Sequence, residues 1–404
     1  MRWPADLLNS AMRLLPGLRA PRPPWDSDDL IRAELLSIER LEEQAASLAL
    51  AQQVTTRPIT RRPLSARLRD NELVLLAAYR DIAVSVSAGR AITPAAEWLL
   101  DNYHLVEEQI REIREDLPPS FYRILPKLAT GPFTGHPRVF GLAWAFVAHT
   151  DSRFDPAALR RFVRAYQRIQ PLTIGELWAV AITLRIVLVE NLRRAAARIV
   201  SSRDARLAAD AVADRLLGVN GAAGEPEYSL ERTPYGSDFP PAFVVQLARR
   251  LRDQDPRVTP ALHWLEQRLG AEGQAIEQVV RDEHHKQGAS NVTVRNIITS
   301  MRLLSDLDWP KFFEDVSLVD EQLRIGSDFA AMDFASRNLY RSAIEELARG
   351  SKWTELEIAQ QAVRVAEAHA AAAPADSPGA SPGASDAVRG RECDPGFHLI
   401  AAGR

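Results

Sequence analysis

Several polar side chains that could bind a ligand lie in the first half of the chain. Asp101, Asn102 and His104 interrupt one apolar segment, and His149 and Asp151 close another. Ligand pockets combine a few polar groups of this kind with apolar and aromatic walls. Three tryptophans could supply the walls of a sugar-binding cleft: Trp98, Trp144 and Trp178. We favour the competing interpretation that all these groups pack the core or satisfy loop backbones, because buried polar groups usually have structural partners.

Two aspartate pairs have the Asp-x-Asp spacing that could hold a metal–nucleotide complex, namely Asp253 with Asp255 and Asp306 with Asp308. A divalent ion that bridges phosphates needs converging oxygen ligands and an open coordination position. Both pairs fall where we expect helix ends, and aspartate is a preferred N-cap residue. We therefore interpret both pairs as helix caps.

A second polar cluster consists of Glu283, His284, His285 and Lys286. Metal-binding histidines on a helix are spaced i, i+4 so that both face one way, whereas adjacent residues point about 100° apart. We therefore predict a solvated helix end here. A helical metal enzyme built on Glu283, His284 and His285 is the more distant alternative.

Three arginines, Arg193, Arg194 and Arg198, follow the most apolar segment of the chain. Basic residues in this position suit the C-terminal end of a helix dipole, and contact with a phosphate or lipid headgroup is the weaker interpretation. The sequence has no glycine-rich phosphate loop, no Gly-x-Ser-x-Gly motif and no cysteine pair. Its basic residues are interspersed with acidic residues, so the sequence also lacks the basic patch that is typical of nucleic-acid-binding proteins. We assign no catalytic, cofactor-binding or metal-binding residue.

The element that must position these groups is the segment 171–194. Thr173 and Glu176 have the spacing of a capping box, and Leu172 and Leu177 that of a hydrophobic staple. The following residues are apolar on nearly every face, which is typical of a buried or membrane-spanning helix. A span needs about 20 mostly apolar residues. This run is shorter and contains Arg185, so we favour a central core helix over membrane contact.

The rest of the chain also reads as helical. Apolar residues recur at helical spacing in 26–53, 68–88, 94–116 and 139–149, and Thr93-Pro94 and Asp155-Pro156 are start signals. Further helices are expected over the ranges 242–254, 259–269, 272–286, 290–304, 311–323, 328–349 and 355–369. Alternating patterns with hairpin turns are missing. The predicted fold is an all-α, multi-helix array.

Composition divides the chain into five segments. We expect a flexible arm at 1–25, a helical domain at 26–217, a Gly/Pro-containing linker at 218–241, a second helical domain at 242–369 and a disordered, low-complexity tail at 370–404. Residues 1–20 lack a secretory signal, and a short membrane-surface helix is the alternative to a frayed arm. The single cysteine excludes an internal disulfide, and the net charge of −3 gives no general attraction to nucleic acid or anionic lipid.

The two helical halves show internal similarity. Residues 92–99 resemble residues 258–265, and a spacing of 155 residues aligns Val139 with Val294 and Leu184 with Leu339. A constant spacing over many residues is the signature of a duplicated unit. Chance matching between amphipathic helices is the alternative.

Several long blocks carry a resemblance to a known family. ITPAAEWLLDNYHLVEEQIREIREDLP at 92–118 and QPLTIGELWAVAITLRIVLVENLRR at 170–194 resemble the N-terminal region of bacterial cyclic β-1,2-glucan synthetases. So do the blocks at 31–52, 70–83, 141–155, 291–309, 333–348 and 394–404. The resemblance implies the cytoplasmic part of a very large inner-membrane protein, in which membrane spans and a UDP-glucose-dependent, metal-requiring transferase follow.

The chain departs from that family in lacking the aspartate pair at a strand end and the Gln-x-x-Arg-Trp motif of the transferase. The resemblance therefore implies a separated, non-catalytic N-terminal portion with no cofactor of its own. It would act as a scaffold or regulatory module for the membrane-embedded transferase, at the inner face of the inner membrane. The alternative is a free-standing module that binds glucan or a nucleotide sugar.

Overall fold

The computed structural model describes residues 27–217, 235, 238–252, 259–271, 273–372 and 391–400. Within these residues the predicted all-α fold is confirmed, and the described strands are β1 (Val54–Thr55) and β2 (Lys127–Leu128). The two strands form one short antiparallel pair in which Val54 lies opposite Leu128. Sequence periodicity did not indicate them, because two residues are too few to alternate.

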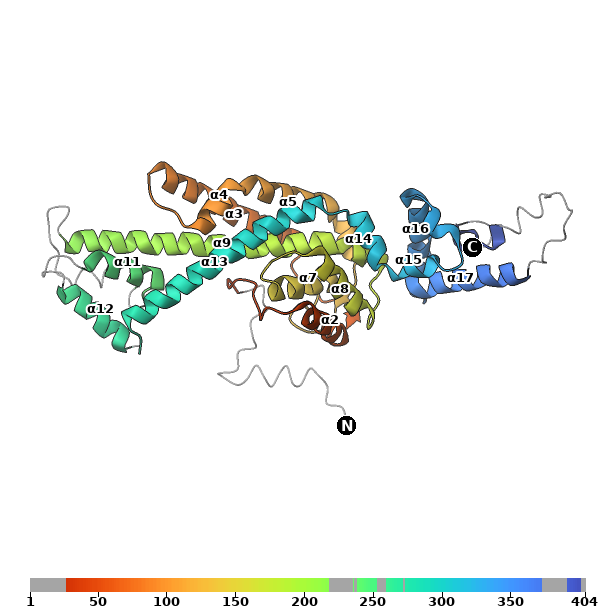
Figure 1. The fold of residues 1–404 in the computed structure, drawn as a ribbon, viewed down its shortest axis with the longest axis horizontal. Coiled ribbons are helices and arrows are strands. Elements are labelled where there is room, and N and C mark those ends of the chain that lie inside the picture. The colour runs from red at the N-terminus through yellow and green to blue at the C-terminus, as the bar shows by residue number, and fades with distance from the viewer. Residues whose placement is uncertain are drawn as a thin grey trace, which may run out of the picture.

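The molecule is organised along α9 (Ile174–Leu216), which follows its long axis (Figure 1). At 1.5 Å per residue its 43 residues span about 65 Å. The predicted capping box is confirmed, because the Thr173 hydroxyl accepts from the Glu176 N–H at 3.1 Å and Glu176 accepts from the Thr173 N–H at 3.0 Å. Among the described helices, none combines enough length with enough apolar character to cross a membrane.

The helices before α9 pack around its first half. Their order along the chain is α2 (Ile38–Ala51), α3 (Leu64–Ser87), α4 (Pro94–Asp101), α5 (Tyr103–Asp116), α6 (Pro119–Ile124), α7 (Arg138–His149) and α8 (Pro156–Gln167). In Figure 1, α3 to α5 lie along one side of α9, and α2, α7 and α8 lie along the other. The central helix is therefore covered on opposite sides, which explains why its first half is apolar all round.

The helices after α9 extend toward both ends of the molecule. They are α11 (Pro241–Leu251), α12 (Thr259–Ala271), α13 (Ile276–Asp306), α14 (Trp309–Val316), α15 (Leu318–Leu323), the 3-10 helix η3 (Asp328–Ala331), α16 (Phe334–Gly350), α17 (Glu355–Ala372) and α19 (Pro395–Ile400). Figure 1 shows α11 and α12 at one end and α15 to α19 at the other, with α13 crossing α9 obliquely between them.

Helix boundaries differ from the predictions in two informative places. The expected helix from Thr93 to about Asp116 breaks at Asn102, whose side-chain amide donates to the Trp98 carbonyl at 2.9 Å. Side chains of this type compete with the backbone for its hydrogen bonds. Conversely, two helices were expected between Glu272 and Leu304, but α13 continues through Gly288. A single glycine costs a helix only about 1 kcal/mol, which the packing of α13 overcomes.

Buried apolar residues form two clusters. The larger surrounds the first half of α9 and draws on residues from Ile31 to Ala196 and from Val294 to Leu399. The smaller joins the end of α9, from Ala205 onward, to α11, α12 and the start of α13. The predicted linker 218–241 lies mostly outside the described residues, and the division into two folding units stays a prediction.

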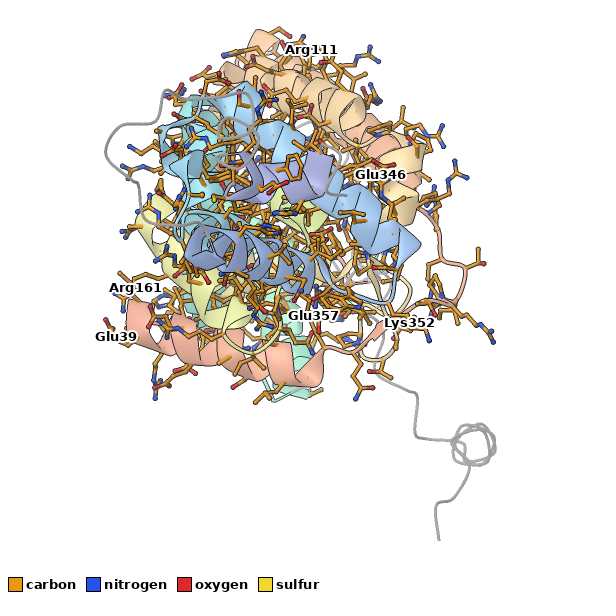
Figure 2. The ribbon with its side chains drawn as sticks, turned by 90° about the vertical axis from the view of Figure 1, so that its right-hand side faces the viewer. Glu39, Arg111, Arg161, Glu346, Lys352 and Glu357 are labelled. Carbon is orange, nitrogen blue, oxygen red and sulfur yellow. The ribbon has the colours of Figure 1, made fainter. Side chains whose placement is uncertain are left out.

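Exposed ion pairs connect some of the outer helices. On the face shown in Figure 2, Arg161 of α8 lies beside Glu39 of α2. Its guanidinium is 3.7 Å from Glu39 and 2.6 Å from Glu42. Pairs of this kind contribute little individually, so the apolar contact between α2 and α8 holds these helices together.

Two further predictions concern the ends and the symmetry of the chain. The arm at 1–25 lies outside the described residues, and in the expected tail the described residues include α19 at Pro395–Ile400. Tyr340 of α16 donates a hydrogen bond to Asp394 at 2.6 Å there. At the spacing of 155 residues, the single helix α9 aligns with the two helices α16 and α17, so the helices differ between the halves, and the duplication stays a prediction.

Candidate functional site

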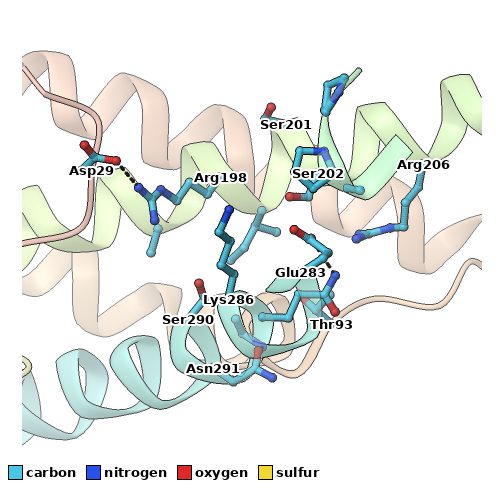
Figure 3. Close-up of a pocket in the computed structure, with 17 residues that line it drawn as sticks. Asp29, Thr93, Arg198, Ser201, Ser202, Arg206, Glu283, Lys286, Ser290 and Asn291 are labelled. Atoms are coloured by element: carbon cyan, nitrogen blue, oxygen red, sulfur yellow. Dashed lines mark hydrogen bonds and ion pairs between the residues drawn. The ribbon is translucent and has the colours of Figure 1, made fainter. Parts of the chain in front are cut away.

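A cavity of about 390 Å³ lies beside the middle of α9, where α11 begins and α13 passes (Figure 3). Side chains from α9 form one wall and side chains from α13 form the facing wall. The first turns of α4 and α11 and the segment before α2 complete it. Its volume falls within the range of small-molecule pockets, which is roughly 300–1,000 Å³.

The charged groups of the cavity come from three parts of the chain. Arg198 of α9 donates to a carboxylate oxygen of Asp29 at 2.6 Å. Arg206 points from α9 toward Glu283 of α13, and Lys286 extends from α13 toward α9 (Figure 3). Within the described part of the chain, neither Arg206 nor Lys286 forms an ion pair within 4 Å or a side-chain hydrogen bond. Both cations are therefore available to a ligand.

Two of these groups are partly withdrawn from water. Burial lowers the pKa of Arg206, while the nearby charge of Glu283 opposes the shift. Glu283 is 7% exposed and accepts a hydrogen bond from Gln287 at 3.0 Å. Charges in such surroundings are less screened than surface charges, so they interact more strongly with a bound ion.

Two helix N-termini also face the cavity, and they differ in how they are capped. At α4, the Thr93 hydroxyl accepts from the Ala96 N–H and Asn291 accepts from the Ala95 N–H. At α11, Pro240 is the N-cap and Pro241 is the first helical residue, so neither provides an N–H, and the Phe243 N–H donates to the Pro240 carbonyl at 2.9 Å. The start of α11 therefore offers few free N–H donors to a ligand.

The candidates predicted around Trp98 lie at the junction of α4 and α5. Asp101 and His104 are exposed, and Trp98 is half-buried against the main core. The side-chain oxygen of Asn102 accepts from Arg302 of α13 at 3.0 Å. The structure brings these four residues together, and none of them lines the cavity of Figure 3.

A second group of candidates lies at the end of α7. His149 Nδ1 is 2.8 Å from the Glu34 carbonyl oxygen, which ties the residue to the chain before α2. Asp151 is buried, pairs with Arg32 at 2.9 Å and accepts from the Thr293 hydroxyl at 2.8 Å. Its φ of 50° is unusual for a residue other than glycine, and these partners stabilise that backbone.

The remaining tryptophans join helices. The ring of Trp144 lies under the buried Arg194 guanidinium, 5.1 Å from its centroid. Trp178 stacks on Phe313 of α14 with ring centroids 4.5 Å apart, and meets Phe334 of α16 edge-on. The candidates are thus distributed over several separate places, and a common sugar-binding cleft stays a prediction.

The two sets of candidate metal ligands have other roles or lie elsewhere. Asp308 caps α14 by accepting from the Lys311 N–H at 3.0 Å, as predicted, while Asp253 and Asp255 lie outside the described residues. Glu283 to Lys286 occupy the interior of α13, so the expected helix end was wrong. In the described part of the chain, no three His, Cys, Asp or Glu side chains converge as a metal site would require.

The arginines that follow the apolar segment do not end a helix, so their prediction as dipole partners was wrong. They lie in the middle of α9, which continues to Leu216. Arg194 donates to Glu190 at 2.8 Å, and Arg193 pairs with Asp28 at 2.8 Å. Of the three, Arg198 reaches the cavity, and its contact with a phosphate stays a prediction.

Buried charged residues elsewhere on α9 form ion pairs with other residues of the protein. Glu176 pairs with Arg138, and both side chains are at most 6% exposed. Burial would raise the pKa of Glu190, but hydrogen bonds and charges from Arg67 and Arg194 outweigh this effect and lower the pKa to about 2. Arg185 pairs with Glu112 at 2.8 Å. These groups therefore stabilise the fold and are not exposed to substrate.

Comparison with known proteins confirms the resemblance seen in the sequence. The chain is 43% identical over 349 residues, 86% of its length, to a protein named cyclic beta-(1,2)-glucan synthase NdvB from Rhizobium meliloti (strain 1021). The aligned region is 12% of that protein, so the chain spans a small part of this relative's length. A scan against protein-family models gave no match.

Proposed function

We propose that this chain takes part in cyclic β-1,2-glucan synthesis as a helical, non-catalytic portion of a glucan synthase. The observation that carries the proposal is the 43% identity to the Rhizobium synthase across 86% of the chain. The buried ion pairs along α9 support the proposal that the chain is not catalytic. A reaction centre needs polar groups that are free to contact substrate. UDP-glucose and a divalent metal would be required by the transferase and not by this chain.

The proposed role is that of a scaffold or regulatory module for a membrane-embedded transferase, at the cytoplasmic face of the inner membrane. Its elongated array of helices supports this role, since the helices packed along α9 present separate surfaces (Figure 1). Co-purification with a membrane fraction that contains the remainder of the relative's synthase tests the location. Recovery of the chain in the soluble fraction only would contradict it.

A segment replacement tests the role in synthesis. In the Rhizobium synthase, the aligned region is deleted in one strain and replaced by this chain in another. We expect the deletion to abolish cyclic glucan production and the replacement to restore it, with synthase abundance measured by immunoblot in both. Undiminished glucan in a deletion strain with normal protein levels would refute the proposal.

A second candidate function is a free-standing module that binds glucan or a nucleotide sugar. The half-buried Trp98 beside the exposed Asp101 and His104 favours it. Calorimetric titration with β-1,2-glucan and with UDP-glucose should then give saturable binding that weakens on Trp98→Ala and on Asp101→Ala. Binding unchanged by both substitutions would exclude this site.

A further inference from the structure

We infer that the cavity beside the middle of α9 binds a small ligand that carries one or two phosphoryl groups. The inference starts from the cations that converge there from different elements. Arg198 and Arg206 come from α9 and Lys286 comes from α13. They lie far apart in sequence, so the helix packing itself assembles the cluster.

The balance of charge in the cavity favours an anion. Asp29 is neutralised by Arg198, and Glu283 faces Arg206, which leaves the charge of Lys286 uncompensated. Arg206 has no hydrogen-bond partner in the described part of the chain, so its guanidinium donors are available. Arginine and lysine together are typical phosphate ligands, the first through its fork of donors and the second as a point charge.

Neutral donors in the cavity point to the same ligand class. Ser201, Ser202 and Ser290 place hydroxyl groups along its walls. Phosphate oxygens accept hydrogen bonds only, which matches a wall rich in donors. A neutral sugar fits less well, because the described residues that line the cavity include no aromatic ring on which a sugar face could stack.

Size and charge exclude other ligands. A cavity of about 390 Å³ suits a pyrophosphate or a small phosphate ester and is too small for a nucleic acid or a protein segment. A divalent cation would have to compete with Arg198 for Asp29 and with Arg206 for Glu283, so the same carboxylates do not form a metal site.

Isothermal titration of the full chain with inorganic pyrophosphate tests the inference. We expect saturable binding with one site per chain. Arg206→Met and Lys286→Met should each weaken it about tenfold, since a charged hydrogen bond is removed while side-chain length is kept. Arg215→Met is the matched control, because Arg215 is an exposed arginine on the same helix. Circular dichroism melts confirm that each variant is folded.

A second arm distinguishes a soluble phosphate from a lipid headgroup. Vesicles of phosphatidylglycerol are sedimented with the same four proteins. Saturable pyrophosphate binding that depends on Arg206 and Lys286 supports the inference. No saturable heat at millimolar pyrophosphate, an equal loss in the Arg215→Met control, or binding to vesicles only would overturn it. The inference does not rest on the role in glucan synthesis, and neither failure implies the other.

Discussion

Both halves of α9 carry charged residues, but one arginine of the second half differs from the buried charges of the first half. In the first half, Glu176, Arg185, Glu190 and Arg194 are all buried, and each has an opposite charge or a hydrogen-bond partner in the core. In the second half, Arg206 is half-buried beside a cavity and has no ion-pair partner in the described part of the chain.

The difference shows how a structural arginine is told from one that is available to a ligand. What matters is whether the guanidinium is buried and whether it has an ion-pair partner, because the residue type is the same in both cases. A buried charge without its partner is strongly destabilising, so core charges must be paired. A charge at a cavity can stay unpaired because water or a ligand solvates it. The predictions below test this contrast, beginning with the most damaging change.

The largest loss of stability should follow Glu176→Ala. The substitution leaves the Arg138 guanidinium buried without its carboxylate and removes the capping box of α9. We expect the free energy of unfolding to fall by about 3–5 kcal/mol, measured by guanidinium chloride denaturation. Asp70→Ala is the control, because it breaks an exposed pair with Arg62 and should leave the midpoint unchanged. Equal effects of the two substitutions would contradict the contrast.

Glu190→Gln should reduce stability in a pH-dependent way. The folded-state pKa of Glu190 is about 2 against 4.5 for the free side chain, so its contribution is fully present above about pH 5 and is lost as the pH falls toward 2. The variant should be less stable by about 3 kcal/mol at pH 7. Denaturation curves from pH 7 to pH 3 should converge for the two proteins. A constant difference across that range would show that Glu190 is not held ionised.

Glu355→Gln should act in the opposite direction. Burial raises the pKa of Glu355 to about 7, with help from Glu345 and Glu176 and against Arg349 and a hydrogen bond from the Ile174 N–H. Because this pKa lies above 4.5, the contribution of Glu355 to stability is fully present below about pH 4.5 and is lost as the pH rises through 7. Glutamine keeps an acceptor for Ile174 without the charge.

We therefore expect the Glu355→Gln variant to match the wild type at pH 4.5 and to exceed its unfolding free energy by about 1–3 kcal/mol at pH 8. Thermal melts at the two pH values measure the difference. A variant that is less stable at pH 8 would mean that the carboxylate is ionised and favourable at the start of α9.

The smallest effect is expected for Arg206→Met. Since the guanidinium has no ion-pair partner among the described residues, its loss should change stability by less than about 0.5 kcal/mol. Denaturation under the conditions used for Glu176→Ala gives the comparison. A decrease of several kcal/mol in the free energy of unfolding would mean that Arg206 stabilises the fold. The contrast between the two halves would then not hold.

Local signals allowed much of the fold to be predicted. The capping box at Thr173 and the Asp155-Pro156 start of α8 were correct, because both depend on residues close together in the chain. The end of α9 was not predicted. Arg193 and Arg198 look like a helix C-terminus in the sequence, but their partners Asp28 and Asp29 lie far away along the chain.

The candidate site was harder to predict from the sequence than the fold. The cavity combines residues near positions 29, 93, 200, 241 and 286, and only helix packing brings these segments together. Lys286 was noticed, but as part of a polar cluster with the neighbouring histidines. Arg206 gave no signal, because an arginine on a helix becomes informative only when its neighbours are known.

Incubation of the purified chain with labelled UDP-glucose and Mg²⁺ or Mn²⁺ tests the central claim most directly. We propose that the polar groups of the core serve the fold and that the chain is a non-catalytic part of a glucan synthase. We therefore expect no glucan product, no release of UDP above the protein-free control and no label on the protein. Turnover or self-glucosylation by the chain would contradict it.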